Sequence, residues 1–242
     1  MTTSFDLHAV KAMVFDTFGT VVDWRGSIIA EGNAYWTPVK GVNVDWGAFA
    51  DSWRGKYGPN MNKVRTGELP WTKLDDLHRM ALDDVLAEQN VSGLSEDDIH
   101  HLNFVWHRLN AWPDAPSGLA RLKSRYIISP LSNGNLSLLT NMAKFAGLPW
   151  DCITSADLFQ HYKPDPETYL GAAAILGLEP GQVMMTAAHT GDLEAAKKLG
   201  LRTAYVHRPH EGGPGRERTM PAQSDFDVVA SDFRDMASKL GL

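Results

Sequence analysis

The chain has 242 residues, of which 43% are hydrophobic and 21% are charged, and its formal net charge is -6. This composition is typical of a globular protein with enough apolar material for a real core, as one domain with an insertion or as two small domains. No basic stripe stands out, so nothing predicts binding to nucleic acid, whereas a weakly acidic total does not exclude an anionic substrate.

The first ten residues lack a basic stretch followed by an apolar run, so we expect no secretory signal. No apolar run approaches the roughly 18 residues of a membrane helix. A single cysteine, Cys152, excludes a disulfide within the chain and a zinc site built from cysteines, and we expect it to be a small buried residue. These features together predict a cytoplasmic protein without a membrane segment.

The first strong element is the apolar run Ala12–Phe15, which leads directly into Asp16 and a glycine-containing turn that ends at Thr20. Such a run before a tight turn is typical of a buried parallel strand.

Residues 24–112 show helical patterns and little convincing strand. Apolar residues recur every three or four positions between Trp71 and Leu86, which indicates an amphipathic helix. Seven of the eight tryptophans lie here; we expect most of them to pack, and one or two could line an apolar substrate chamber. The proline-rich stretch 112–116 returns the chain to the core. The predicted domains are therefore a core of residues 1–23 and 113–242 and a helical cap of residues 24–112.

Short apolar runs alternate with helical patterns through the rest of the chain. Strands are predicted at 126–131, 182–188, 202–206 and 226–229, and helices at 136–145, 166–176, 193–199 and 233–240. This alternation predicts an α/β fold with a doubly wound, Rossmann-like parallel sheet. The segment 208–223, rich in glycine, proline and charge, is expected to be an exposed loop without a chemical role.

Polar side chains follow the ends of several predicted strands and would meet at one edge of a parallel sheet. They are Asp16 with Thr20, Ser132 with Asn133, Lys163, and His189 with Asp192. Each alone has an ordinary structural explanation, such as a turn, a surface lysine or a helix cap. Their common position at strand ends makes a chemical interpretation more specific than any one of them.

In chain order, residues 15–20 (FDTFGT), 131–134 (LSNG), 162–169 (YKPDPETY) and 191–192 (GD) resemble the motifs of the haloacid dehalogenase superfamily. The resemblance covers essentially the whole chain, and residues 24–112 take the position of the family's helical cap. It implies a nucleophilic Asp16 and a homodimer, to which the apolar helix at Leu74–Leu86 could contribute.

Most superfamily members that resemble this chain are phosphatases, which carry a second aspartate in the first motif and an acidic pair for Mg²⁺ in the last. Phe18 and Ala188 stand at two of these positions here. A phenyl ring donates no proton to a leaving group, and a hard cation needs oxygen ligands. Both losses point away from magnesium-dependent phosphoryl transfer, and we expect neither a metal nor a cofactor.

The pattern Asp-x-aromatic-Gly-Thr resembles the L-2-haloacid dehalogenases instead. In that group an aspartate attacks carbon, and water then hydrolyses the resulting ester. The resemblance implies that Asp16 is the nucleophile, that Lys163 keeps it ionised, that Thr20 lies beside it, and that Asp192 is the base for ester hydrolysis. The expected partners are a small 2-haloacid and water.

The same resemblance implies the substrate contacts. Ser132 would bind the substrate carboxylate, Arg54 and Asn133 the halide, and Tyr169 would lie near the lysine. In the last motif His189 replaces an asparagine and Gly191 replaces an aromatic residue that helps to enclose the halide. One hypothesis is that His189 donates a strong hydrogen bond to a small halide, which would favour release of fluoride.

Three alternatives stay open at this point: a phosphatase-like hydrolase without its usual acid, a non-catalytic binding protein on the same fold, and a receiver-type domain phosphorylated on aspartate. Retention of Asp16, Lys163 and Asp192 together disfavours the binding protein, and the long cap insertion disfavours the receiver domain.

Overall fold

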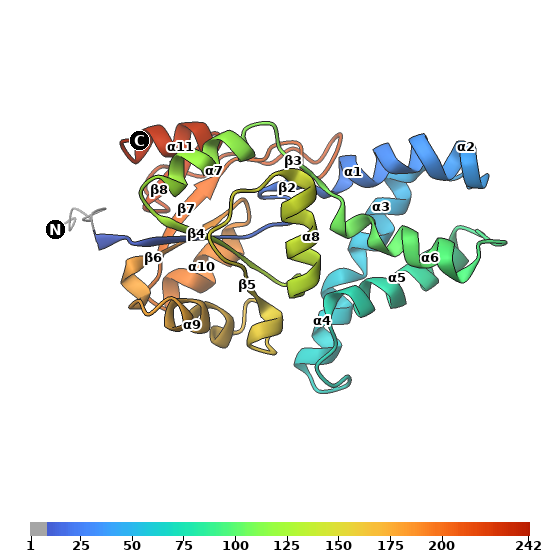
Figure 1. Ribbon diagram of the computed structural model, residues 1–242, viewed down its shortest axis with the longest axis horizontal. Helices are drawn as coiled ribbons and strands as arrows, with labels where there is room; N and C mark the ends of the chain where they lie inside the picture. The colour runs from blue at the N-terminus through green and yellow to red at the C-terminus, as the bar shows by residue number, and fades with distance from the viewer. Residues whose placement is uncertain (1–8) are drawn as a thin grey trace.

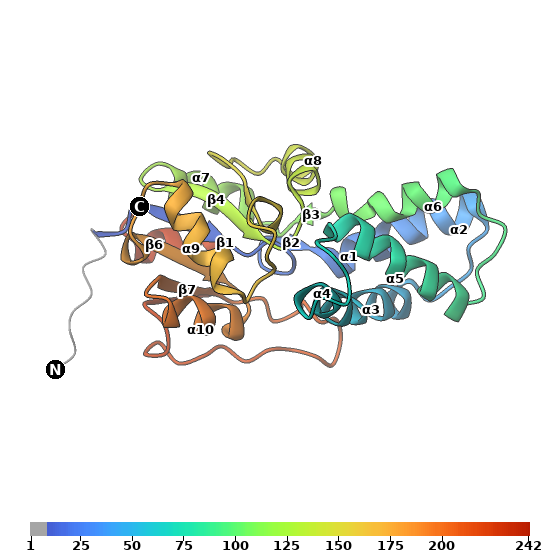
Figure 2. The same cartoon turned by 90° about the horizontal axis from the view of Figure 1, so that it is seen from below.

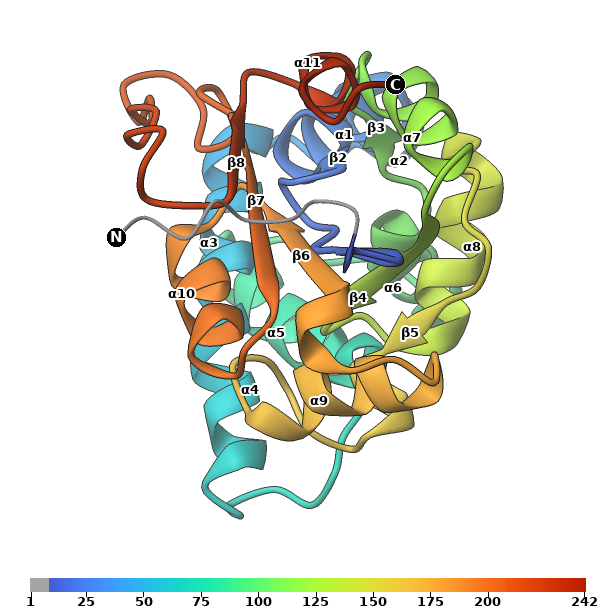
Figure 3. The ribbon, with the colours of Figure 1, turned by 90° about the vertical axis from the view of Figure 1, so that its left-hand side faces the viewer.

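The structure, a computed structural model, describes residues 9–242 (Figure 1). A six-stranded sheet has the order β5-β4-β1-β6-β7-β8, and all neighbouring strands are parallel (Figure 3). The strands are β1 (Ala12–Phe15), β4 (Ile127–Ser132), β5 (Thr154–Ser155), β6 (Val183–Ala187), β7 (Arg202–Val206) and β8 (Val228–Ala230). The predicted α/β fold with a doubly wound parallel sheet is confirmed. Residues 1–8 of the predicted core lie outside the described residues.

Helices cover both faces of this sheet because successive side chains of a strand point to opposite sides. Met13 and Phe15 of β1 belong to one hydrophobic cluster, and Val14 between them belongs to the other. The first cluster is completed by α7 (Ala115–Lys123), α8 (Leu136–Ala146) and α11 (Phe233–Lys239), and the second by α9 (Pro166–Ile175) and α10 (Thr190–Lys198). Strands buried on both faces explain why the sequence showed continuous apolar runs rather than alternation.

The segment between β1 and β4 is mostly helical and extends from one end of the sheet (Figures 1 and 2). Its helices are α1 (Trp24–Glu31), α2 (Thr37–Lys40), α3 (Trp46–Gly55), α4 (Tyr57–Arg65), α5 (Leu74–Glu88) and α6 (Glu96–Asn103). Two short strands, β2 (Val22–Asp23) and β3 (Asn110–Ala111), pair antiparallel where the chain leaves and returns. They lie beside the predicted boundaries at residues 24 and 112, and the division into domains stays a prediction.

The apolar stripe of α5 is used inside the chain. Leu77, Leu82 and Val85 are at most 2% exposed, although Trp71, which the periodicity included, lies before the helix begins. This buried stripe is therefore not available for the dimer contact that the sequence suggested. No helix within residues 9–242 combines the length and the apolar character needed to cross a membrane.

Two expectations about exposure were wrong. Cys152 is exposed, because it lies in the loop between α8 and β5 and contributes its backbone carbonyl, not its side chain, to a hydrogen bond from Ser129. The segment 208–223 is not wholly an exposed loop, since Arg208 and Glu211 are 6% and 4% exposed.

Candidate active site

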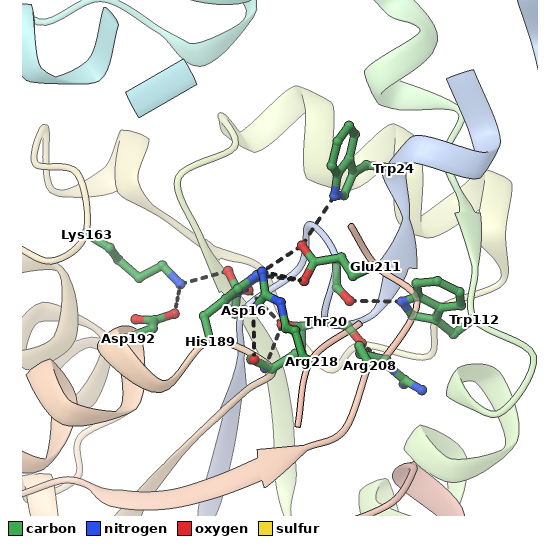
Figure 4. Close-up of polar contacts among 12 residues, drawn as sticks. Asp16, Thr20, Trp24, Trp112, Lys163, His189, Asp192, Arg208, Glu211 and Arg218 are labelled. Carbon is green, nitrogen blue, oxygen red and sulfur yellow. Dashed lines mark hydrogen bonds and ion pairs between the residues drawn. The ribbon is translucent and has the colours of Figure 1, made fainter. Parts of the chain in front are cut away.

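Asp16 lies at the carboxyl end of β1 and is 8% exposed. Its backbone N–H donates to the carbonyl of Thr186 in β6 at 2.9 Å, so the parallel sheet itself fixes the position of the carboxylate. The loops and the helix start that follow the neighbouring strands bring the other polar side chains to the same edge (Figure 4). Asp16 and Asp192, which are 176 positions apart in the sequence, thus contact the same side chain, Lys163.

Lys163 joins the two aspartates. Its ammonium donates to Asp16 Oδ1 at 3.0 Å and to Asp192 Oδ2 at 2.5 Å, while the Tyr169 hydroxyl donates to Asp192 Oδ1 at 2.5 Å. Burial would raise the pKa of Asp16, but the Lys163 charge and hydrogen bonds from its neighbours outweigh burial and hold that pKa well below its usual range. Burial and the repulsion from Asp16 raise the pKa of Asp192 despite Lys163.

The second oxygen of Asp16 receives two further hydrogen bonds. Thr20 Oγ1 donates to Asp16 Oδ2 at 2.7 Å, and His189 Nδ1 lies 2.8 Å from the same oxygen. The Thr20 hydroxyl is oriented in turn by the backbone N–H of Ala188, which donates to it at 3.0 Å. Asp16 therefore has one oxygen held by a single ammonium and one oxygen held by two donors.

His189 connects Asp16 to a carboxylate that the sequence did not predict. Its Nε2 lies 3.0 Å from Glu211 Oε1 and 3.1 Å from Oε2 (Figure 4). Burial would lower the pKa of His189, but hydrogen bonds to Asp16 and Glu211 raise it to about 9. The raised pKa favours the imidazolium form of His189, in which both ring N–H groups are placed to donate to these two carboxylates.

Glu211 comes from the loop between β7 and β8, within the segment predicted to lack chemistry. Trp24 Nε1 donates to Glu211 Oε1 at 3.3 Å, and Arg218 lies 3.1 Å from Oε2. Although burial would raise the pKa of Glu211, the hydrogen bond and charge of His189, together with the charge of Arg218, lower it. The local composition of the loop predicted exposure, and no local signal marked this residue because its partners are distant in the sequence.

Arg208 anchors the same loop. Its guanidinium forms a two-pronged ion pair with Asp114, with distances of 2.8 and 2.9 Å, and donates to the carbonyl of Thr20 at 2.8 Å. Both side chains are at most 10% exposed. The start of the loop is thus bonded directly to the turn that follows Asp16.

A cavity of about 390 Å³ opens beside Asp16. It is lined by Asp16, Arg54, Tyr57, Met61, Asn133, Lys163, Pro164, Tyr169, His189, Gly191 and Asp192. Seven of the nine residues predicted for the site are in this lining, whereas Thr20 and Ser132 are not. The Ser132 hydroxyl is buried and accepts from the backbone N–H of Gly134 at 3.2 Å, so the structure does not bring it to the cavity wall.

Arg54, from α3, brings a positive charge to the cavity from the helical segment. Its guanidinium lies 3.9 Å from the centre of the Tyr57 ring, and its Nη1 is buried without a hydrogen-bond partner within residues 9–242. The amide of Asn133 is oriented on the other wall, where its Oδ1 accepts from the Lys163 backbone at 2.8 Å. A buried, unpaired guanidinium N–H is a ready donor for an anion.

Phe18 and Ala188 are surrounded by protein rather than directed at the cavity. Phe18 is 2% exposed, and its ring packs edge-on against Trp106 with centroids 5.8 Å apart. Ala188 is 1% exposed. The second acid and the additional metal ligand of the phosphatases therefore have no counterpart at these two positions.

Comparison with known proteins gives matches that extend over nearly the whole chain. A family model described as haloacid dehalogenase-like hydrolase matches residues 10–200. The solved structure of a defluorinating L-2-haloacid dehalogenase is 46% identical, with a TM-score of 0.92 and coverage of 96% of both chains. Another solved L-2-haloacid dehalogenase is 44% identical, with a TM-score of 0.91 and coverage of 96% of this chain and 99% of the other. The (S)-2-haloacid dehalogenase 4A of Burkholderia cepacia is 29% identical over 227 residues, which are 93% of this chain and 94% of the relative.

Proposed function

Because the chain belongs to the haloacid dehalogenase-like hydrolase family, we propose that it hydrolyses the carbon–halogen bond of small (S)-2-haloacids and haloacetates to give 2-hydroxy acids. The observation that carries the proposal is the ionised Asp16 carboxylate, which Lys163 holds at the wall of a cavity that also contains Arg54. Similarity to named dehalogenases over nearly the full length supports it. A phosphatase is disfavoured because Phe18 and Ala188 replace the groups that such chemistry requires.

In the first step, an oxygen of Asp16 attacks the halogen-bearing carbon, and the carbon–halogen bond breaks with its electron pair leaving on the halide. Oδ1 is the better nucleophile, because it accepts one hydrogen bond while Oδ2 accepts two. Arg54 and Asn133 receive the halide, and attack at carbon inverts its configuration.

In the second step, water attacks the carbonyl carbon of the Asp16 ester. Asp192, oriented by Lys163 and Tyr169, accepts a proton from that water. The bond between Cγ and the substrate-bearing oxygen then breaks, and Asp192 returns the proton to the departing 2-hydroxy acid. Asp16 regains its carboxylate by releasing the remaining proton. Thr20 lies behind the cavity wall and orients Asp16 through its hydrogen bond to Oδ2. The contact between Ser132 and the substrate carboxylate stays a prediction, because Ser132 does not line the cavity.

Release of fluoride falls within the proposed range, since a relative with 46% identity is named as defluorinating. The structure argues against His189 as the direct fluoride donor, because its Nδ1 and Nε2 both already contact carboxylates. Arg54, which lines the cavity and whose Nη1 has no hydrogen-bond partner within residues 9–242, is the better candidate for that contact.

The finer assignments also belong to this proposal. Residues 24–112 act as a cap domain that supplies Arg54, and the protein works in the cytoplasm as a homodimer. Since the α5 stripe is buried within the chain, the dimer rests on family resemblance and has another interface. Light scattering during size-exclusion chromatography measures the mass directly, and a value equal to one chain would reject the dimer.

The test is halide release from fluoroacetate, chloroacetate, bromoacetate and both enantiomers of 2-chloropropionate, in buffer containing EDTA. We expect halide from the haloacetates and from the (S)-enantiomer, and none from the Asp16→Asn variant. A single turnover in ¹⁸O-water should place ¹⁸O in the peptide that contains Asp16 and not in the product. Failure to release any halide, or label in the first-turnover product, would contradict the proposal.

A further inference from the structure

Glu211 is a buried carboxylate that the mechanism above does not use. It is 4% exposed and is held by Trp24, Arg218 and His189, and through His189 it is connected to Asp16. Three side chains are therefore hydrogen-bonded in a row: the Glu211 carboxylate, the His189 ring and the nucleophile Asp16. Because Glu211 does not line the cavity, it would influence the reaction through its contact with His189.

We propose that Glu211 is a positioning residue which keeps His189 protonated and directed at Asp16 Oδ2, so that His189 and Thr20 form an oxyanion hole for hydrolysis of the Asp16 ester. The inference rests on the proposed function, and it assigns a role to the loop between β7 and β8. The donors are already in place, because Thr20 Oγ1 and His189 Nδ1 lie 2.7 and 2.8 Å from that oxygen. These are the distances at which oxyanion donors operate.

The two oxygens of Asp16 divide the reaction between them. When Oδ1 forms the ester bond, Oδ2 becomes the ester carbonyl oxygen. Attack of water on Cγ breaks the carbonyl π bond and places its electron pair on Oδ2, where both donors meet the new charge. Collapse restores that π bond and breaks the Cγ–Oδ1 bond, so that Oδ1 leaves with the product. No redox change or additional reactant is involved.

Glu211 matters most in this second step. In the free enzyme two carboxylates, Asp16 and Glu211, favour the charged form of His189. Once Asp16 is esterified it carries no charge, and Glu211 is the one remaining carboxylate in contact with the imidazolium among the described residues. Loss of the Glu211 charge would then allow His189 to lose its proton, and a neutral imidazole is a weaker donor or offers Oδ2 no hydrogen at all.

Other charges surround this pair and contribute to its titration. Asp16 and Glu211 contact the His189 ring directly. Lys163 contacts Asp16 from the other side and links it to Asp192. The positive charges of Arg218 and Arg54 help to lower the pKa of Glu211. Because Arg218 is bonded to Glu211 and also donates to the Ala188 carbonyl at 3.3 Å, it fixes the loop against the strand end that carries His189.

The experiment is the Glu211→Gln variant, which keeps the shape of the side chain and removes its charge. Rapid-quench kinetics with chloroacetate separate the first-turnover release of chloride from turnover, and intact-protein mass spectrometry measures the Asp16 ester. We expect ester hydrolysis to slow at least about tenfold at pH 8, the ester to accumulate, and the loss to shrink at lower pH as His189 regains its proton. The matched control is Glu217→Gln, the same change at an exposed position of the same loop.

Two further measurements make the test decisive. The first is an NMR titration of the His189 ring in the wild-type protein, with the signal assigned by its loss in His189→Asn. We expect the ring to be protonated still at pH 8, and a ring that is neutral at pH 7 overturns the inference. This measurement does not depend on whether the Glu211 variant folds. Glu211→Asp should recover part of the lost hydrolysis rate. An unchanged pH profile and no ester accumulation in folded Glu211→Gln also overturn it. If the wild-type protein releases no halide at all, it is the proposed function that fails.

Discussion

Replacing Lys163 with methionine would remove the charge that lies between Asp16 and Asp192 while keeping a long, flexible side chain. At the 3.0 Å between Lys163 Nζ and Asp16 Oδ1, two unit charges attract by about 5.5 kcal/mol at an effective dielectric constant of about 20. This energy corresponds to about 4 pKa units at about 1.36 kcal/mol per unit. With partial compensation by Thr20 and His189, we expect the pKa of Asp16 to rise by about 2 to 4 units.

The sign of the effect on activity follows from the reaction. Asp16 attacks only as a carboxylate, so its raised pKa removes activity first at low pH. The profile of kcat/KM for chloroacetate should therefore show an acid limb in Lys163→Met that lies about 2 to 4 pH units above that of the wild-type protein. The control is Lys198→Met, which removes the same charge from an exposed position on α10.

The free energy of unfolding of Lys163→Met should also depend on pH, for the same reason. In the wild-type protein the lowered pKa of Asp16 contributes stability above the unfolded value of 3.8, and this contribution is lost as pH falls through the folded pKa. In the variant most of this contribution disappears, so the loss of unfolding free energy should be about 3–5 kcal/mol at neutral pH and smaller in acid. An unmoved acid limb in a folded variant would refute the role given to Lys163.

Three other changes test separate parts of the site. Arg54→Met should lower kcat/KM by about 10²-fold or more without lowering the melting temperature by more than a few degrees, and a variant with normal halide release would exclude Arg54 from the anion contact. Arg208→Met leaves Asp114 buried without its ion pair and should cost about 3–5 kcal/mol in urea unfolding; a loss below 1 kcal/mol would contradict that anchoring. Gly19→Ala would place a Cβ 2.0 Å from Glu211 Oε1 at a backbone φ of +80°, so crystallography should show Glu211 displaced, and an undisturbed contact with His189 would contradict the close fit.

Local patterns were sufficient to predict the core of the fold. Ala12–Phe15 and Arg202–Val206 form strands over the predicted residues, because strands buried on both faces are continuous apolar runs. The strands Thr154–Ser155 and Val22–Asp23 were not predicted, because a strand of two residues is too short to show a periodic pattern. Helix Ala115–Lys123 was also missed, since the prolines around residue 113 indicated a turn, although proline is well tolerated in a first helical turn.

The site divides in the same way. Asp16 and Asp192 could be predicted because each follows a predicted strand in a recognisable motif, and a parallel sheet brings such strand ends together. Lys163 follows no predicted strand and could be predicted only from its motif. Tyr57 and Met61 at the cavity, and Glu211 behind it, follow no motif. Their positions depend on how the helical segment and a long loop pack against the sheet, which a local pattern does not encode.

The loop between β7 and β8 shows what the composition concealed. Its glycines and prolines predicted exposure, and much of residues 214–220 is exposed, yet the first part of the loop is bonded to the core through Arg208. Gly19 completes the arrangement: Glu211 occupies the space where any other residue at position 19 would carry its Cβ. The glycine of the first motif thus serves two purposes, the sharp turn after Asp16 and the close approach of Glu211. A motif that the sequence presented as local is therefore also one half of a contact with a loop 192 positions away.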